Sequence, residues 1–308
     1  MVEQANAASL ETFYKRKISL TFRLGRGQFG VSGSQELHVS GHRIQATINM
    51  VGGVAGSSAE LRVYGLSQTL MNDLNQPVLT PNADGGRNNT IIITAGNEGG
   101  PLSRIFQGNI VSAWQDNSDT PDTCLNVYST AMAFSSLADY PSSSYKGIAS
   151  IADAVGTIVR SLGFIFENDG VTARASDIVL TGSSAQQLDE LARMGRFQRF
   201  FDNGTYVIWP EGKGRSNLIT DVSPATGMIG YPSFTGNGLN FKTVLRPEIR
   251  FGQSLKVTSD LLPACGIWNI KTVTHDIESE TPGGEWLTSI ETTRPLYGDS
   301  GSPPGASS

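Results

Sequence analysis

The sequence has few of the residues on which catalytic and metal sites are usually built. Its 308 residues include three histidines and two cysteines, and their spacing matches no zinc motif. Cys124 and Cys265 each fall within or beside an expected strand, where a thiol usually behaves as a small buried hydrophobe. A disulfide between them is the alternative interpretation. We therefore expect no enzymatic activity, no cofactor and no bound metal, and we assign no catalytic, cofactor-binding or metal-binding residues.

An excess of basic residues and long apolar runs are also missing. Lys and Arg number 23 against 28 Asp and Glu, a net charge of −5, so a surface for nonspecific nucleic-acid binding is not expected. No apolar run approaches the roughly 20 residues of a membrane span. Residues 1–17 lack the apolar centre of a signal peptide. We expect a soluble protein without membrane insertion, synthesised in a reducing cytoplasm.

Glycine is abundant, with 35 residues, and alternating apolar residues recur, which indicates a chain rich in strands and turns. A short helix capped by Ser67 follows the first strands. Together with the strands that come after it, this helix completes a first domain, a closed or nearly closed barrel of six to eight strands. The expected strands lie at 15–24, at 36–50 with a break near Gly41, at 59–66 and within 90–130.

Part of this first domain is repeated near the C-terminus. Residues 90–128 and 249–294 both contain a strand, a turn, a long strand ending in an acidic polar loop, and a further strand. Any two β-meanders share some of this order, but we favour the interpretation that a β-domain is duplicated. The matched residues are Ile110 with Ile270 and Asp116 with Asp276, both at the same sequence interval, and Ile91 and Ile93 with Leu255 and Val257 after a small change of register.

Between the two β-domains the periodicity becomes helical. Residues 147–162 place apolar side chains at spacings of three and four, which predicts an amphipathic helix. A second helix is capped by Ser183 or Ser184, and the pair Asn203-Gly204 predicts a hairpin. The expected division is a flexible arm at 1–14, a first tube-like β-barrel domain at 15–130, a linker at 131–146, an α+β insert at 147–210, a linker at 211–227, a second tube-like β-barrel domain at 228–294 and a flexible tail at 295–308.

Four short motifs match catalytic or ligand-binding patterns, and each lacks the context that its chemistry requires. The GxGxxG match at 25–30 is not followed by a helical period that would direct amides at a phosphate. Ser300 lies in a protease-like GDSGSP, but the eight residues after it cannot build a substrate pocket. Ser143 and Lys146 lack the companions of an SxxK motif, and the run 116–122 lacks calcium-loop spacing. We interpret these four as turns, linkers or tail.

Three segments carry a resemblance to a known family. They are AELRVYGLSQTLMNDLNQ at 59–76, the strand pair RIFQGNIVSAW and DTCLNVYST within 104–130, and the block at 227–293, which includes NGLNFKTVLRPEIRFGQSLKV and a His-Asp step in its last meander. The order of these segments resembles the tail-tube-like baseplate hub proteins of contractile-tailed bacteriophages, over roughly residues 15–294.

The resemblance implies a structural homotrimer on the axis of the virion tail, made in the host bacterial cytoplasm. Two related β-domains per chain give six similar units, which adapts a sixfold tail tube to a threefold central spike. Barrel edges pair between subunits, and DNA passes through the lumen without specific binding. The implied partners are the tail tube protein, the central spike protein and, at the outward-facing insert, surrounding baseplate proteins.

Two functions of other classes remain as alternatives. One is a tail-associated hydrolase acting on the cell wall. The other is a receptor- or glycan-binding protein at the tail tip, which would use exposed aromatic side chains such as Trp114 or Trp209.

Overall fold

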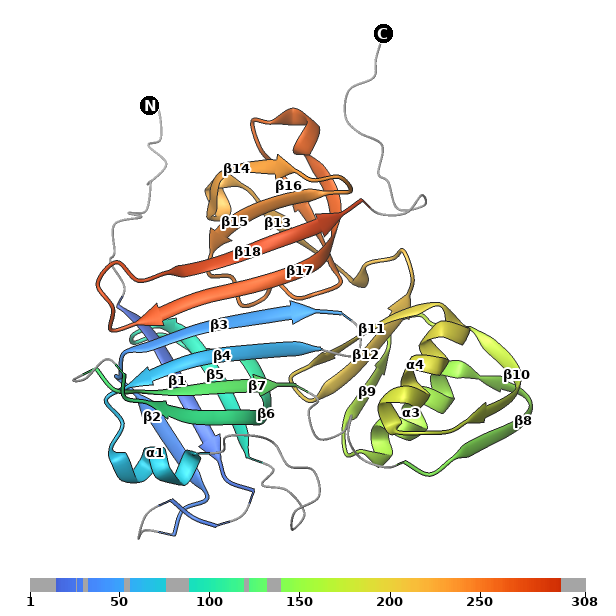
Figure 1. The fold of residues 1–308 in the computed structure, drawn as a ribbon. Helices are drawn as coiled ribbons and strands as arrows, with labels where there is room; N and C mark the ends of the chain where they lie inside the picture. The colour runs from blue at the N-terminus through green and yellow to red at the C-terminus, as the bar shows by residue number, and fades with distance from the viewer. Residues whose placement is uncertain are drawn as a thin grey trace.

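The computed structural model describes residues 15–25, 27–29, 33–52, 56–75, 89–118, 122–131 and 140–294 (Figure 1). The expected arm at 1–14, the expected tail at 295–308 with Ser300, and most of the loop expected at 77–89 lie outside these residues. The described chain is mainly β. Within it, no helix has the length and apolarity needed to cross a bilayer.

Seven strands and one helix form what we call the N-terminal unit. The strands alternate as the sequence predicts: Ile18, Leu20 and Phe22 are fully buried on one face of β1. The helix α1 begins where expected, because the Ser67 hydroxyl oxygen accepts a hydrogen bond from the Leu70 amide. The elements are β1 (Arg16–Arg23), β2 (Glu36–Ser40), β3 (Ile44–Val51), β4 (Ser57–Tyr64), α1 (Gln68–Leu74), β5 (Thr90–Asn97), β6 (Ser103–Asp116) and β7 (Cys124–Thr130).

Six strands form the C-terminal unit. Its last two strands form a hairpin closed through the Pro/Gly loop after Ser279, and Ile270, Val273 and Ile277 are buried in the first of them. The elements are β13 (Arg215–Val222), the 3-10 turn η1 (Pro224–Thr226), β14 (Met228–Phe234), β15 (Leu239–Val244), β16 (Gln253–Val257), the 3-10 turn η2 (Leu262–Ala264), β17 (Gly266–Ser279) and β18 (Trp286–Thr293).

The two units share one strand order. Read across the sheet, the N-terminal unit runs β3-β4-β7-β6-β5-β1, with β2 as an additional strand beyond β1, and the C-terminal unit runs β14-β15-β18-β17-β16-β13. The long strands β6 and β17 both have 14 residues. Each has a pairing irregularity at the matched place, between Ile110 and Ser112 in β6 and between Ile270 and Thr272 in β17. The strand order of one unit therefore recurs in the other.

The register before the long strands explains the small shift seen in the sequence. Ile91 pairs with Gly108, and Leu255 pairs with Trp268. Gly108 and Trp268 are separated by the same number of residues as Ile110 and Ile270. Their partners, Ile91 and Leu255, are separated by slightly more residues, which is the small change of register. One pairing differs between the units, because β1 is antiparallel to β5 while β13 is parallel to β16.

Strands β17 and β3 join the two units into a single 13-stranded sheet. The pairing is antiparallel and runs from Thr272 opposite Val51 to Ser279 opposite Ile44. The strand order ends at β14 on one side and β2 on the other, and among the described residues the sheet does not return on itself. The closure of each unit into a barrel, expected from the sequence, is therefore not confirmed.

The insert contains the two expected helices and the expected hairpin. Helix α4 has a capping box in which the side chains of Ser183 and Gln186 each bind the other's backbone amide. The tip of the β11–β12 hairpin is Asn203-Gly204, both at positive φ. The elements are β8 (Ser143–Ser150), α3 (Ile151–Ser161), β9 (Ile165–Asn168), β10 (Arg174–Leu180), α4 (Ser184–Gly195), β11 (Phe197–Asp202) and β12 (Thr205–Pro210).

The predicted start of the first helix was wrong. Helix α3 begins at Ile151 because Ser150 caps it, and residues 147–150 instead extend β8, which pairs with β10. Ile148, expected on the apolar stripe of the helix, has 74% of its surface exposed. The helical spacing of apolar residues extends by chance into residues 147–150, which belong to β8 because they pair with β10, a strand that follows the helix in the sequence.

Both expected linkers also contain regular structure. Strand β8 begins at Ser143, inside the segment 131–146, and β13 occupies part of the segment 211–227. Each strand is specified by a distant partner, β10 for β8 and β16 for β13. Both strands lie in segments rich in turn-forming residues and show little alternation of apolar and polar side chains, so the local pattern could not reveal this pairing.

The insert and the two units share one hydrophobic core. Phe200 and Trp209 of the insert pack against Phe251, with ring centroids 5.1 and 5.8 Å away. The Phe251 ring also lies directly over Gly52 of the N-terminal unit, where a Cβ atom would be only 2.2 Å from it. This aromatic cluster fixes the insert at the side of the sheet (Figure 1).

Candidate functional site: the polar face of the sheet

One face of the large sheet is polar across both units. In an antiparallel sheet, residues directly opposite one another point to the same side. One row of such residues is apolar and buried in the core: Ala113, Val127, Leu61, Ala46 and Ile277. The neighbouring rows point the other way and form what we call the polar face: Ser112, Tyr128, Glu60, Thr47 and Asp276 in one row, and Trp114, Asn126, Arg62, Gln45 and Glu278 in the next.

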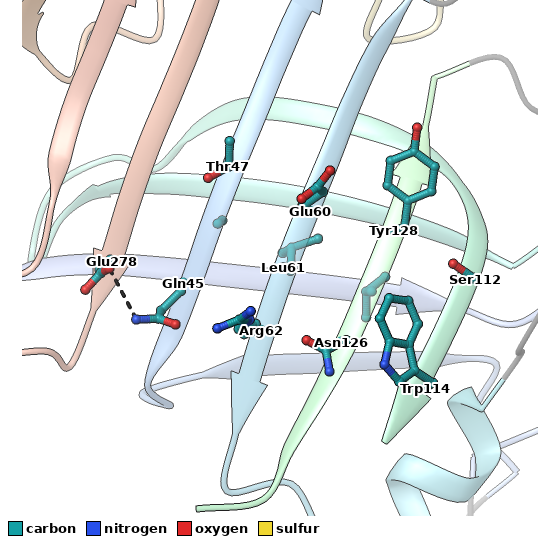
Figure 2. Close-up of a pocket in the computed structure, with 12 residues that line it drawn as sticks. Gln45, Thr47, Glu60, Leu61, Arg62, Ser112, Trp114, Asn126, Tyr128 and Glu278 are labelled. Atoms are coloured by element: carbon teal, nitrogen blue, oxygen red, sulfur yellow. Dashed lines mark hydrogen bonds between the residues drawn. The ribbon is translucent and has the colours of Figure 1, made fainter. Parts of the chain in front are cut away.

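The polar face is open. Figure 2 shows its side chains on one side of β17, β3, β4, β7 and β6, around a shallow depression of about 620 Å³. Helix α1 packs on the opposite side of β6, since its Gln68 exchanges hydrogen bonds with Gln115, which alternates with Trp114 along the strand. In the described part of the chain, the insert helices α3 and α4 lie beside the sheet (Figure 1).

Hydrogen bonds between side chains cross the seam of β3 and β17. The Thr47 hydroxyl donates to Asp276 Oδ1 over 2.8 Å. On either side of this pair, two further bonds join Thr274 to Asn49 over 2.9 Å and Gln45 to Glu278 over 3.2 Å. Polar side chains therefore stabilise the junction between the two units on the side that faces away from the core.

The same face continues over the C-terminal unit. The register places Ser289 and Lys242 beside Thr274, and Glu291 and Asn240 beside Thr272. On the central part of this face, formed by β7, β4, β3, β18, β15, β6 from Ser112 and β17 from Lys271, the charged residues are the acidic Glu60, Asp116, Asp276, Glu278 and Glu291 and the basic Arg62, Lys242 and Lys271. Five negative and three positive charges give this central part a net charge of −2, and the cations Arg104 and Lys256 point to the same side at its ends. Two hydrogen bonds from Ser118 lower the pKa of Asp116 and keep its carboxylate ionised.

The short motifs of the sequence take structural roles in the described residues. After Gly25 the described part of the GxGxxG match contains an isolated bridge between Phe29 and Ser34, and β2 follows. Ser143 and Lys146 lie in strand β8. Asp116 of the run 116–122 accepts its hydrogen bonds from Ser118. No three His, Cys, Asp or Glu side chains among the described residues are grouped so as to hold a metal ion.

His38, His42 and Cys265 each form a hydrogen bond with a different partner. His38 bonds to Thr21 across β1 and β2, and His42 bonds to the Tyr64 carbonyl. Cys124 is buried and Cys265 is partly buried, and neither takes part in a disulfide, so the alternative disulfide does not form. The Cys265 thiol donates to the Ser259 carbonyl over 3.1 Å.

His275, the histidine of the His-Asp step in the last meander, is a buried polar residue. Its side chain is fully buried in β17, and Nδ1 lies 2.9 Å from the Thr288 hydroxyl. Nε2 is buried without a hydrogen-bond partner. Burial, with a smaller contribution from the positive charge of Arg250, lowers its pKa to about 3. The imidazole ring is therefore uncharged at neutral pH and packs in the protein core.

The two tryptophans considered for glycan binding differ in exposure. Trp209 is only 2% exposed, because it packs in the aromatic cluster between the insert and the C-terminal unit. It cannot present its ring to a sugar. Trp114 is 46% exposed and lies on the polar face beside Asn126 (Figure 2).

The comparisons with known proteins place these features in a family. The model of the family described as baseplate hub gp41 matches residues 18–282. Similar solved structures include a tail protein from Neisseria meningitidis MC58 (11% identity, 91% of this chain and 97% of that chain, TM-score 0.60) and the 43 kDa tail protein of prophage MuSo2 from Shewanella oneidensis (9%, 90% and 97%, TM-score 0.58). No curated protein matches.

A third similar structure comes from a secretion system. It is the E. coli c3393 protein, described as a component of the type VI secretion system with structural similarity to the T4 bacteriophage tail proteins gp27 and gp5. It has 10% identity, with 85% of this chain and 76% of that chain covered, and a TM-score of 0.54. At these identities the three structures share the fold with this chain.

Proposed function

We propose that this chain, which belongs to the baseplate hub gp41 family, is a structural and non-enzymatic subunit of a homotrimeric hub on the axis of a phage tail. In this role it adapts the sixfold tail tube to the threefold central spike. It is synthesised in the host cytoplasm and becomes part of the virion in the tail baseplate.

The observation that carries this proposal is the repeated strand order within one chain. The same order and the same irregularity in the long strand occur at Ile110 and at Ile270. Closed symmetric assemblies present one copy of each surface per subunit. A trimer can match six tube subunits only if each chain offers two similar surfaces, and two related tube-like units meet that requirement.

We further propose that the polar face lines an axial channel. Nonspecific DNA binding requires Lys and Arg side chains that neutralise phosphates, and on the central strands of this face acidic charges outnumber basic ones by two. Hydroxyl and amide groups such as Thr47, Ser112 and Asn126 keep the surface hydrated between the charges. DNA would therefore pass during ejection without being held.

The insert would face outward, towards surrounding baseplate proteins. It lies at the side of the sheet, and its two-stranded ribbon β8–β10 exposes Ile148 and Val179 at 74% and 66%. Apolar side chains this exposed in a monomer are suited to contact with another protein.

The trimer is tested by light scattering on the full chain during size exclusion, alone and after mixing with the tube and spike proteins of the same phage. We expect a species with three times the 32.9 kDa mass of one chain. A mass of one chain under all of these conditions would contradict the proposed function.

A further inference from the structure

We infer that the segment directly after β18 docks on its own chain, with the Leu296 side chain in an aromatic groove between the insert and the C-terminal unit. The flexible tail expected from the sequence would then begin at Gly298. This inference concerns a single chain, and it does not depend on the proposed trimer.

The groove lies where the insert hairpin meets one end of the C-terminal unit, and its volume is about 760 Å³. The buried rings of Trp209, Phe251 and Trp268 form its floor. Phe234 lies on its rim and is 50% exposed. Concave sites with an apolar, aromatic lining suit apolar groups of a ligand or peptide.

Strand β18 brings the chain to the rim of this groove, because Thr293 and Arg294 both line it. The Arg294 amide donates a hydrogen bond over 3.3 Å to the carbonyl of Asn237, in the turn between β14 and β15. The Arg294 guanidinium lies over the Trp268 ring, 5.9 Å from its centroid. The next residue, Pro295, therefore starts at the groove.

The pairing at the end of β18 indicates which side chain faces the floor. The last pair of β17 and β18 joins Asn269 to Thr293. The next residues, Trp268 and Arg294, then stand opposite each other, which agrees with the contact between the guanidinium and the ring. Side chains two residues apart in an extended chain point to the same side, so Leu296 shares the side of Arg294 and faces the aromatic floor.

Backbone preference and space both suit this continuation. The residue before a proline favours extended conformations, so Pro295 keeps Arg294 in line with β18. At the same register Leu296 stands opposite Gly266, and nothing lies within 4 Å of the Cβ position of that glycine. β16 pairs with the other edge of β17 at this point, so the edge next to the segment has no strand among the described residues. The Leu296 side chain therefore has open space beside an apolar surface.

The composition of residues 295–308 favours docking of the first few residues. Leu296 and Tyr297 are their only large apolar side chains, and Asp299 is their only charged residue. The groove is lined by three cations and one acidic side chain: Lys213, Lys271, Arg294 and Glu211. Five extended residues span roughly 17 Å, so Asp299 stays within reach of these cations.

The attachment of the segment favours its own groove over that of a neighbouring chain. A short segment that starts at its binding site has an effective concentration on the order of millimolar, well above that of a second chain in dilute solution. Docking within one chain is therefore the occupant that we assign to the groove.

Site-specific photocrosslinking tests the docking. The full chain with Leu296→p-benzoylphenylalanine is irradiated, and crosslinked peptides are mapped by mass spectrometry. We expect most crosslinks to join position 296 to the groove, at 209–213, 234–238 and 266–271. The same group at Tyr297, which the alternation points away from the floor, and at Ser307 should give several-fold fewer crosslinks to these residues.

Isotope labelling identifies which chain provides the groove. A mixture of chains labelled with nitrogen-15 and unlabelled chains is irradiated under the same conditions. We expect groove crosslinks that join peptides of one label only. Crosslinks that join the two labels in statistical proportion would assign the groove to the segment of a second copy and would overturn docking within one chain.

Two truncated chains measure what the docked segment contributes to stability. A chain that ends at Arg294 lacks Leu296, whereas a chain that ends at Asp299 retains it. We expect the shorter chain to melt about 2–3 °C below the full chain and the longer one to melt with it. Equal melting temperatures of the two truncated chains would overturn the docking.

The remaining outcomes are also decisive. Crosslinks from position 296 that are spread over the whole surface overturn the docking, and equal groove crosslinking from positions 296 and 297 overturns the assigned side of the segment. Neither result changes the mass of the assembly, so light scattering tests the proposed trimer independently.

Discussion

Gly252 shows how closely the insert is packed against the C-terminal unit. Its φ is +80°, and a Cβ atom there would lie 2.3 Å from the Trp209 ring. Gly252→Ala therefore combines left-handed backbone strain with overpacking, and we expect a loss of about 3 kcal/mol in the free energy of unfolding. Gly236→Ala is the matched control in the same region, because nothing lies within 4 Å of its Cβ position. Urea unfolding of the two variants measures the difference, and equal stabilities would contradict this packing.

His275 gives the stability of the fold a specific dependence on pH. Its pKa is about 3 in the folded chain against an ordinary value of 6.5, so the unfolded chain binds the proton more readily. The stability from the neutral ring is complete above about pH 6.5 and is lost as the pH falls towards 3. At roughly 1.4 kcal/mol per pH unit, the loss between pH 6.5 and 4.5 is on the order of 2–3 kcal/mol.

The variant His275→Gln isolates this contribution, because glutamine does not titrate and retains polar groups that can reach the Thr288 hydroxyl. Denaturant unfolding at pH 7 and pH 4.5 should show a smaller acid-induced loss in the variant than in the natural chain. The carboxylates titrate equally in both proteins and cancel in the comparison. An identical loss would mean that His275 is already protonated, or accessible to water, in the folded chain.

At the scale of elements, Arg250 joins three segments that are far apart in the sequence. Its guanidinium donates to the carbonyls of Arg104 and Ile105 at the start of β6, over 2.7 and 2.8 Å. It also lies 3.7 Å from Asp202 at the end of β11. Because the side chain is mostly buried, we expect Arg250→Ala to lower stability by about 3 kcal/mol.

The comparison variant for Arg250 is Lys271→Ala, which removes an exposed ion pair with Glu291. Exposed pairs contribute less than about 1 kcal/mol, so this variant should unfold close to the natural chain in thermal or urea scans. If both variants lose the same stability, the contacts of Arg250 do not hold the elements together.

The elements that the sequence predicted are those with a strong local period or a cap. Ile18, Leu20 and Phe22 predicted β1 by alternation, Ser67 and Ser183 predicted two helix starts, and Asn203-Gly204 predicted a hairpin. Among the strands that were missed, β8, β10 and β13 have weak alternation and depend on pairing with distant strands. Open sheet edges were missed for the same reason, because closure of a barrel depends on strands that are remote in the sequence.

The polar face could be predicted only in part. Alternation in β3 and β4 identifies Gln45, Thr47, Glu60 and Arg62 as facing away from the core, since the residues between them are apolar. The register that aligns them with Asp276 depends on the pairing of β3 with β17, which lie near opposite ends of the chain. The constant interval between the two units, in contrast, was visible in the sequence and reappears in the irregularities of β6 and β17.

At the scale of the whole molecule, the weakly acidic charge of the polar face should keep DNA from binding. Glu60→Lys with Glu278→Lys changes the charge of the central part of this face from −2 to +2 in each chain. We expect the double variant to retard duplex DNA on a gel at low salt, with the effect lost as salt rises, whereas the natural hub does not. Glu167→Lys with Glu211→Lys makes the same change of charge in the insert and at the residue directly after it. If both double variants retard DNA equally, the effect comes from total charge alone, and the polar face is not the surface that DNA contacts.

The proposed hub requires three chains to supply six similar units around an open axis. End-on electron micrographs of the purified hub, averaged without imposed symmetry, test this claim most directly. We predict a threefold ring with six alternating densities around a central channel and three outer densities from the inserts. A ring of any other order, or a particle closed on its axis, would contradict it.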